Sequence, residues 1–458
     1  MNLKFILLKA IIHCGINNRF SLISSFFKIA SKKLLKIYQW MKIKKIIKYS
    51  YNNSPFYQHL FTKNNIKPSD IKTIKDLSKI PLTESKHLQQ EINNFFTKPK
   101  IEFIKVFTTS GSTGDPKQSY FTKRELDSII NTNVIGLQLM TGISSEDVIR
   151  MSLSTGYGPE IWGNSYILDH AFYKIGCLSI ATERLEINDE IRILEKYNPT
   201  IFVDVTSRIQ YLTKELEKNV NLPKNKVQKI LSGAEPTPNK LRKELEKKWN
   251  ADIFIGYGIS EICPIMASEC TEKNGMHLNE LSFFVEVIHP KTKKQLPPGE
   301  IGELIYTSLN RMGMPIIRYN SHDLGCVYPD MCKCGIPLAR IKIMGRTDDL
   351  FPIGSGDNIF PSTFDEVILT ISEVIEYKII LTRENGKDVM TILAETDINN
   401  SKTEMKISNA VKKIPEIRNG IEKSKTIAEP IVKLLERNTF NRKTIKKVRI
   451  YDKRNLYN

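Results

Sequence analysis

The residues best suited to chemistry stand in one glycine- and hydroxyl-rich stretch, TTSGSTGDPK, at residues 108–117. Glycine lets backbone N–H groups approach an anion closely, and hydroxyl groups add donors that can turn toward phosphate oxygens. The stretch therefore predicts a polyphosphate cradle formed by Thr108, Thr109, Ser110, Gly111, Ser112, Thr113 and Gly114. Lys117 either adds a point charge or stays solvated. A P-loop is excluded because it needs glycine directly before the lysine, where Pro116 stands. A serine- and threonine-rich surface loop is the alternative.

Four further motifs follow along the chain. They are LSGAEPTP at residues 231–238, IGYGISEI at 255–262, RYNSHDLG at 318–325 and GRTDDLF at 345–351. With the first stretch they resemble the adenylate-forming superfamily of acyl-CoA synthetases and related ligases. PFYQHLF near the start, CKCG before GRTDD and FPSTFDE after it resemble the phenylacetate–CoA ligase branch. The resemblance runs from about residue 43 to residue 454.

The resemblance implies ATP-dependent activation of a carboxylic acid. An acyl-adenylate forms with release of pyrophosphate, and the acyl group then passes to CoA as a thioester. ATP, Mg²⁺ and CoA are the cofactors implied. A different acceptor is the alternative: an amine, a carrier protein, or a sugar in surface-polysaccharide synthesis.

The same resemblance implies roles for residues of the central motifs. Glu261 helps to hold Mg²⁺, and the Ser260 hydroxyl lies near the α-phosphate. The ring of Tyr257, which is followed by Gly258, lies against adenine. Without the resemblance, Tyr257 reads as a half-buried aromatic at a strand end, and Glu261 as a first-turn charge favoured by a helix dipole.

Further nucleotide contacts are implied on either side of these residues. The adenine pocket is lined by Gly233, Ala234 and Glu235, which otherwise read as a simple turn. Asp323 is placed to accept both ribose hydroxyls, and Arg318 and Arg346 could meet ribose or phosphate.

The end of the chain resembles the hinge and the terminal motif of the superfamily. Asp348 stands at the hinge position, where a small domain pivots between two reactions. Aligning Arg449, Asp452 and Arg454 places the catalytic lysine at Lys446, but Ile445 replaces the usual glycine. Lys443 and Lys447 therefore stay open as alternatives. For the acid, Tyr157 and Trp162 are the candidate apolar slot, with Phe202 as a further candidate.

Four residues form a candidate metal set: Cys270, His277, Cys332 and Cys334. Three thiolates and one imidazole suit a closed tetrahedral zinc site. The C-x-C spacing is tighter than usual, and spacing alone favours ordinary core cysteines. The pattern resembles members of the phenylacetate–CoA ligase branch that hold zinc, which implies a structural Zn²⁺.

These motifs need an α/β scaffold to position them. Short β-rich runs at residues 148–154, 201–205 and 253–255 alternate with amphipathic stretches at 123–140, 189–197, 208–218 and 238–249. Thr122 with Glu125 predicts a capping box, and Thr237-Pro238 predicts a second helix start. We expect a mixed sheet covered by helices, with ligands beyond the carboxyl ends of its strands. The predicted domains are a large one at 1–345, helical over 1–95, and a small mobile α+β one at 346–458.

Composition bounds the location and the partners. Seven cysteines and the absence of a clear export signal or spanning segment predict a cytoplasmic protein. The net charge of +18 favours anionic partners, and the basic segment at 5–48 leaves peripheral membrane contact open. A basic protein that binds nucleic acid is the competing class, but the phosphate-loop residues are intact and no RNA motif is visible. No nucleic-acid partner is expected, and the oligomeric state is not predicted.

Overall fold

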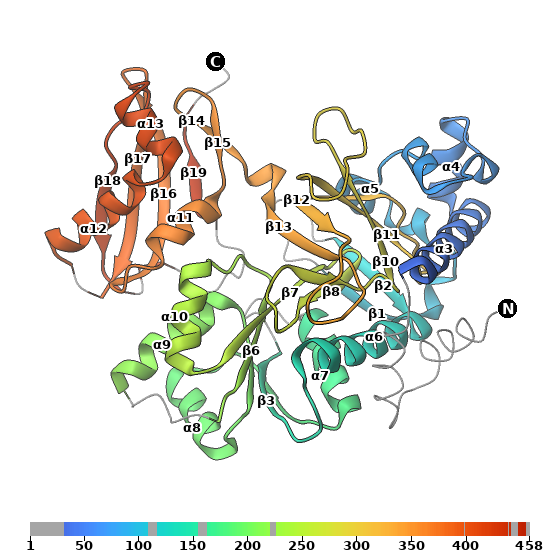
Figure 1. Cartoon of the computed structure of the whole chain (residues 1–458), viewed down its shortest axis with the longest axis horizontal. Coiled ribbons are helices and arrows are strands. Elements are labelled where there is room, and N and C mark those ends of the chain that lie inside the picture. The colour runs from blue at the N-terminus through green and yellow to red at the C-terminus, as the bar shows by residue number, and fades with distance from the viewer. Residues whose placement is uncertain are drawn as a thin grey trace.

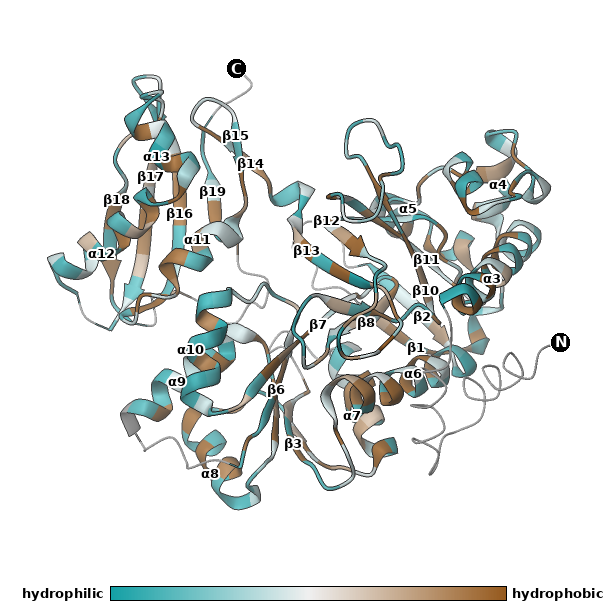
Figure 2. Cartoon of the chain, viewed as in Figure 1, coloured by the Kyte–Doolittle hydropathy of each residue, from teal (hydrophilic) through white to brown (hydrophobic). Residues whose placement is uncertain are grey.

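The computed structural model describes residues 32–108, 117–153, 163–219, 226–397, 399–437, 439–440 and 448–454. Its strands form one large mixed sheet and, separately, a small sheet near the C-terminus (Figure 1). Hydrophobic residues concentrate along the strands, and hydrophilic residues cover the outward faces of helices such as α10 (Asn239–Trp249) and α12 (Ser401–Lys412) (Figure 2). The α/β class predicted from the sequence is confirmed.

The large sheet has 11 strands in the order β10-β11-β12-β13-β9-β8-β7-β6-β5-β3-β4. Neighbours from β7 to β4 are parallel, whereas β7 pairs with β8 antiparallel. Its strands are β3 (Val148–Ser152), β4 (Leu178–Thr182), β5 (Ile201–Val203), β6 (Lys229–Gly233), β7 (Asp252–Ile259), β8 (Cys263–Glu269), β9 (Met276–Leu278), β10 (Phe283–Ile288), β11 (Gly302–Ser308), β12 (Tyr319–Tyr328) and β13 (Arg340–Arg346). The sheet therefore changes from parallel to antiparallel at β7, where one of the central motifs lies.

Helices and a separate hairpin accompany this sheet. The hairpin pairs β1 (Phe103–Thr108) with β2 (Gln118–Thr122). The helices are α3 (Lys32–Asn53), α4 (Pro55–Lys63), α5 (Ser85–Gln90), α6 (Lys123–Thr141), α7 (Gly163–Ile175), α8 (Ile187–Tyr197), α9 (Thr206–Asn219) and α10. Within the described part of the chain, none of the helices combines the length and hydrophobicity needed to cross a membrane.

The sequence predicted the N-terminal capping residues of α6 and α10, and the structure confirms only the first prediction. Thr122 and Glu125 form the predicted capping box of α6, with the backbone N–H of Thr122 donating to Oε2 of Glu125 at 2.8 Å. The predicted start of α10 was wrong in detail. Its N-cap is Pro238, and the hydroxyl of Thr237 instead bonds that of Thr206 at 2.6 Å.

The small sheet has the strand order β18-β17-β16-β19 and carries three helices. A short 3-10 helix, η5 (Thr347–Asp349), precedes it. The elements are β14 (Phe351–Ile353), β15 (Asp357–Ile359), α11 (Pro361–Ile368), β16 (Val374–Glu384), β17 (Lys387–Thr396), α12, α13 (Pro415–Glu422), β18 (Ile431–Leu435) and β19 (Ile450–Asp452).

The two sheets share one hydrophobic cluster. Leu241 of α10 and Ile253 of β7 belong to the same buried cluster as Phe364 and Ile368 of α11. Polar contacts surround this cluster, including the side-chain amide of Gln210, which donates to the carbonyl oxygen of Leu369 at 3.1 Å. The small sheet is therefore packed on the side of the large sheet that carries α9 and α10 (Figure 1).

Candidate active site

The central motifs lie at the carboxyl ends of β6 and β7, which are adjacent parallel strands. Two glycines are required there by close approach of the backbone. A Cβ on Gly233 would lie 2.6 Å from the carbonyl oxygen of Gly256, and a Cβ on Gly258 would lie 1.8 Å from that of Pro264. Any side chain at either position would push the strand ends apart. The crevice outside the carboxyl ends of parallel strands is the usual ligand site in such sheets.

Glu261 follows β7 and is the carboxylate at the centre of the site. The Nζ of Lys117 lies 2.6 Å from Oε1 of Glu261, and the hydroxyl of Tyr319 donates to the same oxygen at 3.2 Å. Burial, reinforced by the charge of Glu261, holds the pKa of Tyr319 well above its ordinary value, so this hydroxyl stays a donor. The structure thus brings the predicted phosphate lysine onto the predicted magnesium carboxylate.

Arg311 fixes the backbone at Glu261 and was missed by sequence reasoning. Its Nη1 donates to the carbonyl oxygens of Glu261 and Ile262 at 2.9 and 3.0 Å, and its Nη2 to that of Tyr120 at 2.8 Å. Burial lowers the pKa of Arg311 to about 10, so it remains a cation at neutral pH. The available signal was a charged residue beside the apolar run 312–317, but its carbonyl partners are not readable from sequence.

Tyr257 and Asp323 meet across the antiparallel half of the sheet. The Tyr257 hydroxyl donates to Oδ2 of Asp323 at 2.5 Å, and Nη1 of Arg346 lies 3.5 Å from Oδ1 of the same carboxylate. Nη2 of Arg346 lies 3.0 Å from Oδ2 of Asp348. One chain of polar contacts therefore joins the predicted adenine residue, the predicted ribose carboxylate and the predicted hinge residue.

The turn after β6 has a strained backbone. Ala234 has a φ of +67°, a left-handed conformation that non-glycine residues seldom adopt. Glu235 accepts a hydrogen bond from the backbone N–H of Ser207, which ties this turn to the start of α9. Such local strain is found where a site imposes a particular backbone shape.

Arg318 bonds to a different set of residues. Its side chain is 4% exposed, and its Nε lies 3.0 Å from Oε2 of Glu286. Its Nη1 donates to the carbonyl oxygens of Ser78 and Ile80. This guanidinium is committed to structural partners, so we leave it out of the nucleotide-binding set.

Several predicted residues lie outside the described part of the chain. They are Thr109, Ser110, Gly111, Ser112, Thr113 and Gly114 of the phosphate loop, Tyr157 and Trp162 of the acid slot, and Lys443, Lys446 and Lys447 near the C-terminus. Thr108 is described and ends β1.

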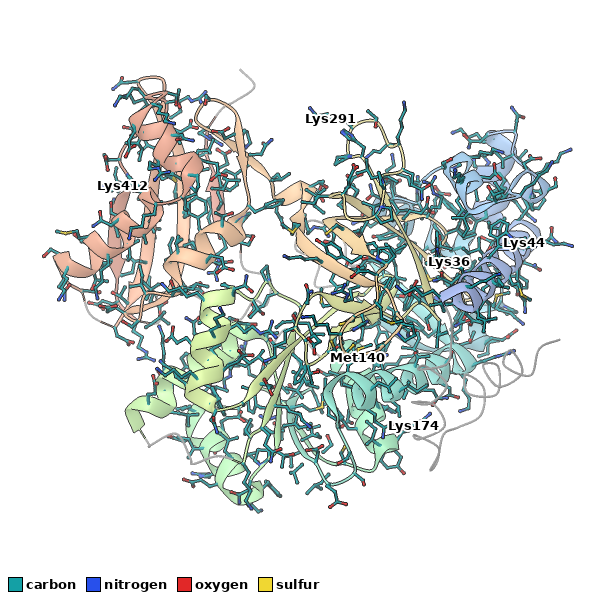
Figure 3. All side chains as sticks on the ribbon, viewed as in Figure 1. Lys36, Lys44, Met140, Lys174, Lys291 and Lys412 are labelled. Atoms are coloured by element: carbon teal, nitrogen blue, oxygen red, sulfur yellow. The ribbon has the colours of Figure 1, made fainter. Side chains whose placement is uncertain are left out.

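An apolar cavity of about 120 Å³ lies beside the site. Gly256 and Tyr257 of β7 and Gly233 of β6 line it, together with residues of α6, α7 and β8. Met140, labelled in Figure 3, is one of the lining residues of α6. Phe202 is absent from the described lining and is instead 1% exposed, with its ring 5.7 Å from that of Trp249. It is a core residue, and its placement in the acid slot was wrong.

The four predicted metal ligands come together from β9 and two loops. The ligand atoms of Cys270, His277, Cys332 and Cys334 all lie within 4.8 Å of one another. Sγ of Cys270 is 3.8 Å from Sγ of Cys332, and Sγ of Cys334 is 3.3 Å from Nε2 of His277. Zinc–sulfur bonds of about 2.3 Å give a tetrahedral sulfur–sulfur edge of about 3.8 Å. The donor set and its spacing fit a tetrahedral zinc ion.

His277 has the orientation that a metal ligand needs. Its Nδ1 lies 3.1 Å from the carbonyl oxygen of Leu338, which fixes the ring with Nε2 toward the thiols. Ligating histidines commonly donate their other nitrogen to such an acceptor. Burial lowers the pKa of His277 to about 4, so the ring is neutral at physiological pH.

Comparison with known families decides the relationship. A family model described as AMP-binding enzyme matches residues 61–313, more than half of the chain. A second, described as AMP-binding enzyme C-terminal domain, matches residues 356–454. The chain belongs to the AMP-binding enzyme family. The resemblance drawn from the five motifs is confirmed.

Curated relatives of this AMP-binding enzyme include four phenylacetate–coenzyme A ligases, among them those of Pseudomonas putida and Thermus thermophilus. That of Pseudomonas putida is 29% identical over 372 residues, covering 80% of this chain and 83% of the relative. That of Thermus thermophilus is 28% identical over 370 residues, covering 80% and 82%.

Solved structures share the fold of this AMP-binding enzyme. A 2-hydroxyisobutyryl-CoA ligase in the postadenylation state superposes with a TM-score of 0.80 at 21% identity, covering 92% of this chain and 90% of the other. The same ligase in the thioesterification state gives 0.65 at 22% identity over the same shares. Both forms of that ligase therefore share the overall fold of this chain.

Proposed function

We propose that this AMP-binding enzyme is an acid–CoA ligase. It joins a carboxylic acid to AMP, releases pyrophosphate, and then transfers the acyl group to the thiol of CoA. The observation that carries the proposal is the set of contacts made by Glu261. A lysine and a tyrosine hydroxyl converge on this carboxylate next to the Tyr257–Asp323 pair. With Mg²⁺ held by Glu261, that combination could offset the charge of a triphosphate and hold a nucleoside within one crevice.

In this proposal, the phosphates bind between β1 and β2. Thr108 and residues 109–114 wrap the β- and γ-phosphates, and the Ser260 hydroxyl lies near the α-phosphate. Glu261 would help to hold Mg²⁺, which would supply positive charge to the phosphates. Lys117 would turn from Glu261 to phosphate if Glu261 held Mg²⁺. Arg311 acts as a positioning residue because it holds the backbone, rather than the carboxylate, of Glu261.

The nucleoside part of ATP binds to β6, β7 and β12. The Tyr257 ring packs on adenine, which Gly233, Ala234 and Glu235 border. Asp323 accepts the ribose hydroxyls, with Arg346 beside it. Asp323 already accepts the Tyr257 hydroxyl, so the two residues are held in register before ATP arrives.

The small C-terminal part supplies the remaining catalytic group. We place the boundary between residues 345 and 346 and the hinge at Asp348, which contacts Arg346 of the nucleotide site. Lys446, with Lys443 and Lys447 as alternatives, stabilises charge on the attacking carboxylate and the α-phosphate. Arg449 supports this placement because its Nε lies 2.9 Å from Oδ1 of Asp365, which anchors the chain just after these lysines.

We also infer that Cys270, His277, Cys332 and Cys334 bind one structural zinc ion. Support comes from the tetrahedral spacing and from the carbonyl that orients His277. The ion would clip the loop of Cys332 and Cys334 to β9. It has no part in the chemistry because three thiolates and one imidazole complete its coordination.

The cytoplasmic location and the membrane contact of the N-terminal segment stay predictions. Lys36 and Lys44 project from α3, where Figure 3 labels them, and both are exposed. Their exposure is compatible with a solvated helix face as well as with contact to anionic lipid.

The proposal is tested by pyrophosphate release with ATP and Mg²⁺ over a panel of aryl, short-chain and hydroxy acids. We expect at least one acid to support release, and added CoA to convert it to a thioester. Hydroxamate formation without any CoA thioester would move the second step to another acceptor.

A further inference from the structure

Gly136 is an unusual residue for its place in the fold. It lies in the interior of α6, near neither end of a 19-residue helix. Apart from proline, glycine is the least favourable residue in a helix interior, because it gives up the most backbone freedom and offers no side chain to pack. A glycine at such a position needs a reason.

The two common structural reasons for glycine do not apply to Gly136. Its φ lies outside the left-handed range, so the backbone does not require it. Among the residues that the structure describes, no atom lies within 4 Å of the position that a Cβ would occupy, so close packing of a described neighbouring element does not require it either. Alanine would therefore fit both the conformation and the space.

The space above Gly136 is the apolar cavity of the active site. Gly136 lines this cavity with Leu139 and Met140 of the same helix, and Gly256 and Tyr257 line it from β7. The cavity thus runs from the proposed nucleotide residues to the bare backbone of α6. The missing side chain leaves room for a group of another molecule.

The chemistry of the lining restricts what that group can be. Leu168, Phe254, Ile265 and Leu281 are among the residues that surround the cavity, and most of its described lining is carbon. Its charged lining residues include Arg184 and Asp204, and Asp204 already accepts hydrogen bonds from the Ser152 hydroxyl at 3.0 Å and from the Val205 backbone at 2.8 Å. A charged group that lay against the carbon part of this lining would be poorly solvated.

The volume of the cavity indicates the size of the acyl group that it can take. An engineered apolar cavity of about 150 Å³ takes up benzene. This cavity measures about 120 Å³. The volume therefore suits an acyl group about the size of one six-membered ring or a chain of similar volume.

We propose that Gly136 is the specificity-determining residue of the acid site, and that the acid has a hydrophobic acyl group that lies against the bare α-carbon of Gly136. This inference rests on the proposed function for the identity of the site as an acid site. Helix α6 gives up helical stability at Gly136 and gains room for the acyl group.

The test compares Gly136→Ala and Gly136→Val with Ser128→Val. Ser128 lies on the same helix, is partly exposed and is outside the described cavity lining, so its substitution controls for valine in α6. Each protein is given a series from acetate through butyrate and hexanoate to benzoate and phenylacetate. Pyrophosphate release with ATP and Mg²⁺ is one readout, and acid binding by calorimetry without ATP is the second.

We expect Gly136→Val to lower kcat/KM for the bulkiest accepted acid about tenfold or more while acetate is unaffected. Gly136→Ala is expected to shift the preference in the same direction with a higher Tm, and it keeps the test available if the valine variant fails to fold. Ser128→Val should keep the wild-type acid profile.

The two readouts separate failure of this inference from failure of the proposed function. An unchanged acid profile in both Gly136 variants, in turnover and in binding, overturns the inference while the ligase assignment stands. If no acid supports pyrophosphate release in the wild type, the function fails and binding alone decides. Weaker binding of bulky acids by the Gly136 variants then supports the inference, and equal binding, or none in the wild type, overturns it.

Discussion

At the scale of single residues, the site depends on charges whose partners come from distant parts of the chain. Glu261 contacts Lys117, which is 144 residues earlier, and Tyr319, which is 58 residues later. The motifs made Glu261 and Lys117 predictable individually. Tyr319 lies within a recognised motif, but its contact with Glu261 depends on the pairing of distant strands and could not be read from sequence.

Glu261→Gln is the substitution that tests this carboxylate. The amide keeps the shape but loses the negative charge that holds Lys117 and, in the proposed mechanism, Mg²⁺. We expect pyrophosphate release to fall by about 10²–10³-fold with the fold intact. Steady-state kinetics over a Mg²⁺ titration measure it, and Glu416→Gln, at a partly exposed site on α13, is the control. A rate within error of the wild type at all Mg²⁺ concentrations would remove Glu261 from the site.

His322 predicts a pH dependence of stability. Its Nε2 lies 3.1 Å from Oε2 of Glu84, and its Nδ1 lies 3.7 Å from Asp348 and 3.9 Å from Glu303. The hydrogen bond with Glu84, helped by the charges of Asp348 and Glu303, raises the pKa of His322 against the effect of burial. The folded state therefore binds the proton more tightly than the unfolded state does.

The sign of the effect follows from this raised pKa. The stabilisation is fully present below the ordinary histidine pKa of about 6.5 and is lost as pH rises through the folded-state value. Urea unfolding of wild type and His322→Gln should show the larger difference at pH 6 and a smaller one at pH 9. His59→Gln, at an exposed histidine, should show none. A gap that stays constant or grows with pH would contradict the assignment.

At the scale of elements, the sequence predicted a helix start correctly where the capping contacts lie within a few residues of that start. The capping box of α6 was predicted correctly because the side chains of Thr122 and Glu125 each accept a hydrogen bond from the backbone N–H of the other residue. The start of α10 was misread because its first N–H groups are met by a residue from elsewhere. The backbone N–H of Asn239 donates to Oε1 of Glu366, which lies on α11, at 2.8 Å. The sequence around α10 cannot indicate a hydrogen-bond partner that is 127 residues away along the chain.

The metal set belongs to this scale because it joins β9 to the loop before β13. Four residues of suitable type were visible in the sequence, but only the fold shows that they converge. We expect about one zinc ion per chain by elemental analysis, and Cys334→Ser to lower both the zinc content and Tm. Cys177→Ser, at a cysteine outside the cluster, should change neither. Folded protein without zinc, and with an unchanged Tm after chelation, would rule the ion out.

At the scale of the whole molecule, the small C-terminal part packs on α9 and α10 by contacts that can be broken. Lys214 donates to the carbonyl oxygen of Ser372 at 3.0 Å, and Glu366 meets the N-terminus of α10. A carboxylate at a helix N-terminus contributes about 0.5–2 kcal/mol. A contact of this size can set a domain equilibrium without locking it.

Glu366→Ala should therefore shift the orientation of the small part rather than unfold it. We expect a larger radius of gyration in solution scattering and slower acyl-adenylate formation, with Tm nearly unchanged. Glu404→Ala, at an exposed position on α12, is the matched control. Identical scattering and identical adenylation for both variants would show that Glu366 does not hold the two parts together.

The central claim is that one crevice at the ends of β6 and β7 binds ATP and activates an acid on it. ATP–pyrophosphate exchange, measured with purified protein, Mg²⁺ and the acid panel, tests this most directly. The account predicts isotope exchange that requires an acid and is lost in Glu261→Gln. Folded protein that binds no ATP and shows no exchange with any acid would contradict it.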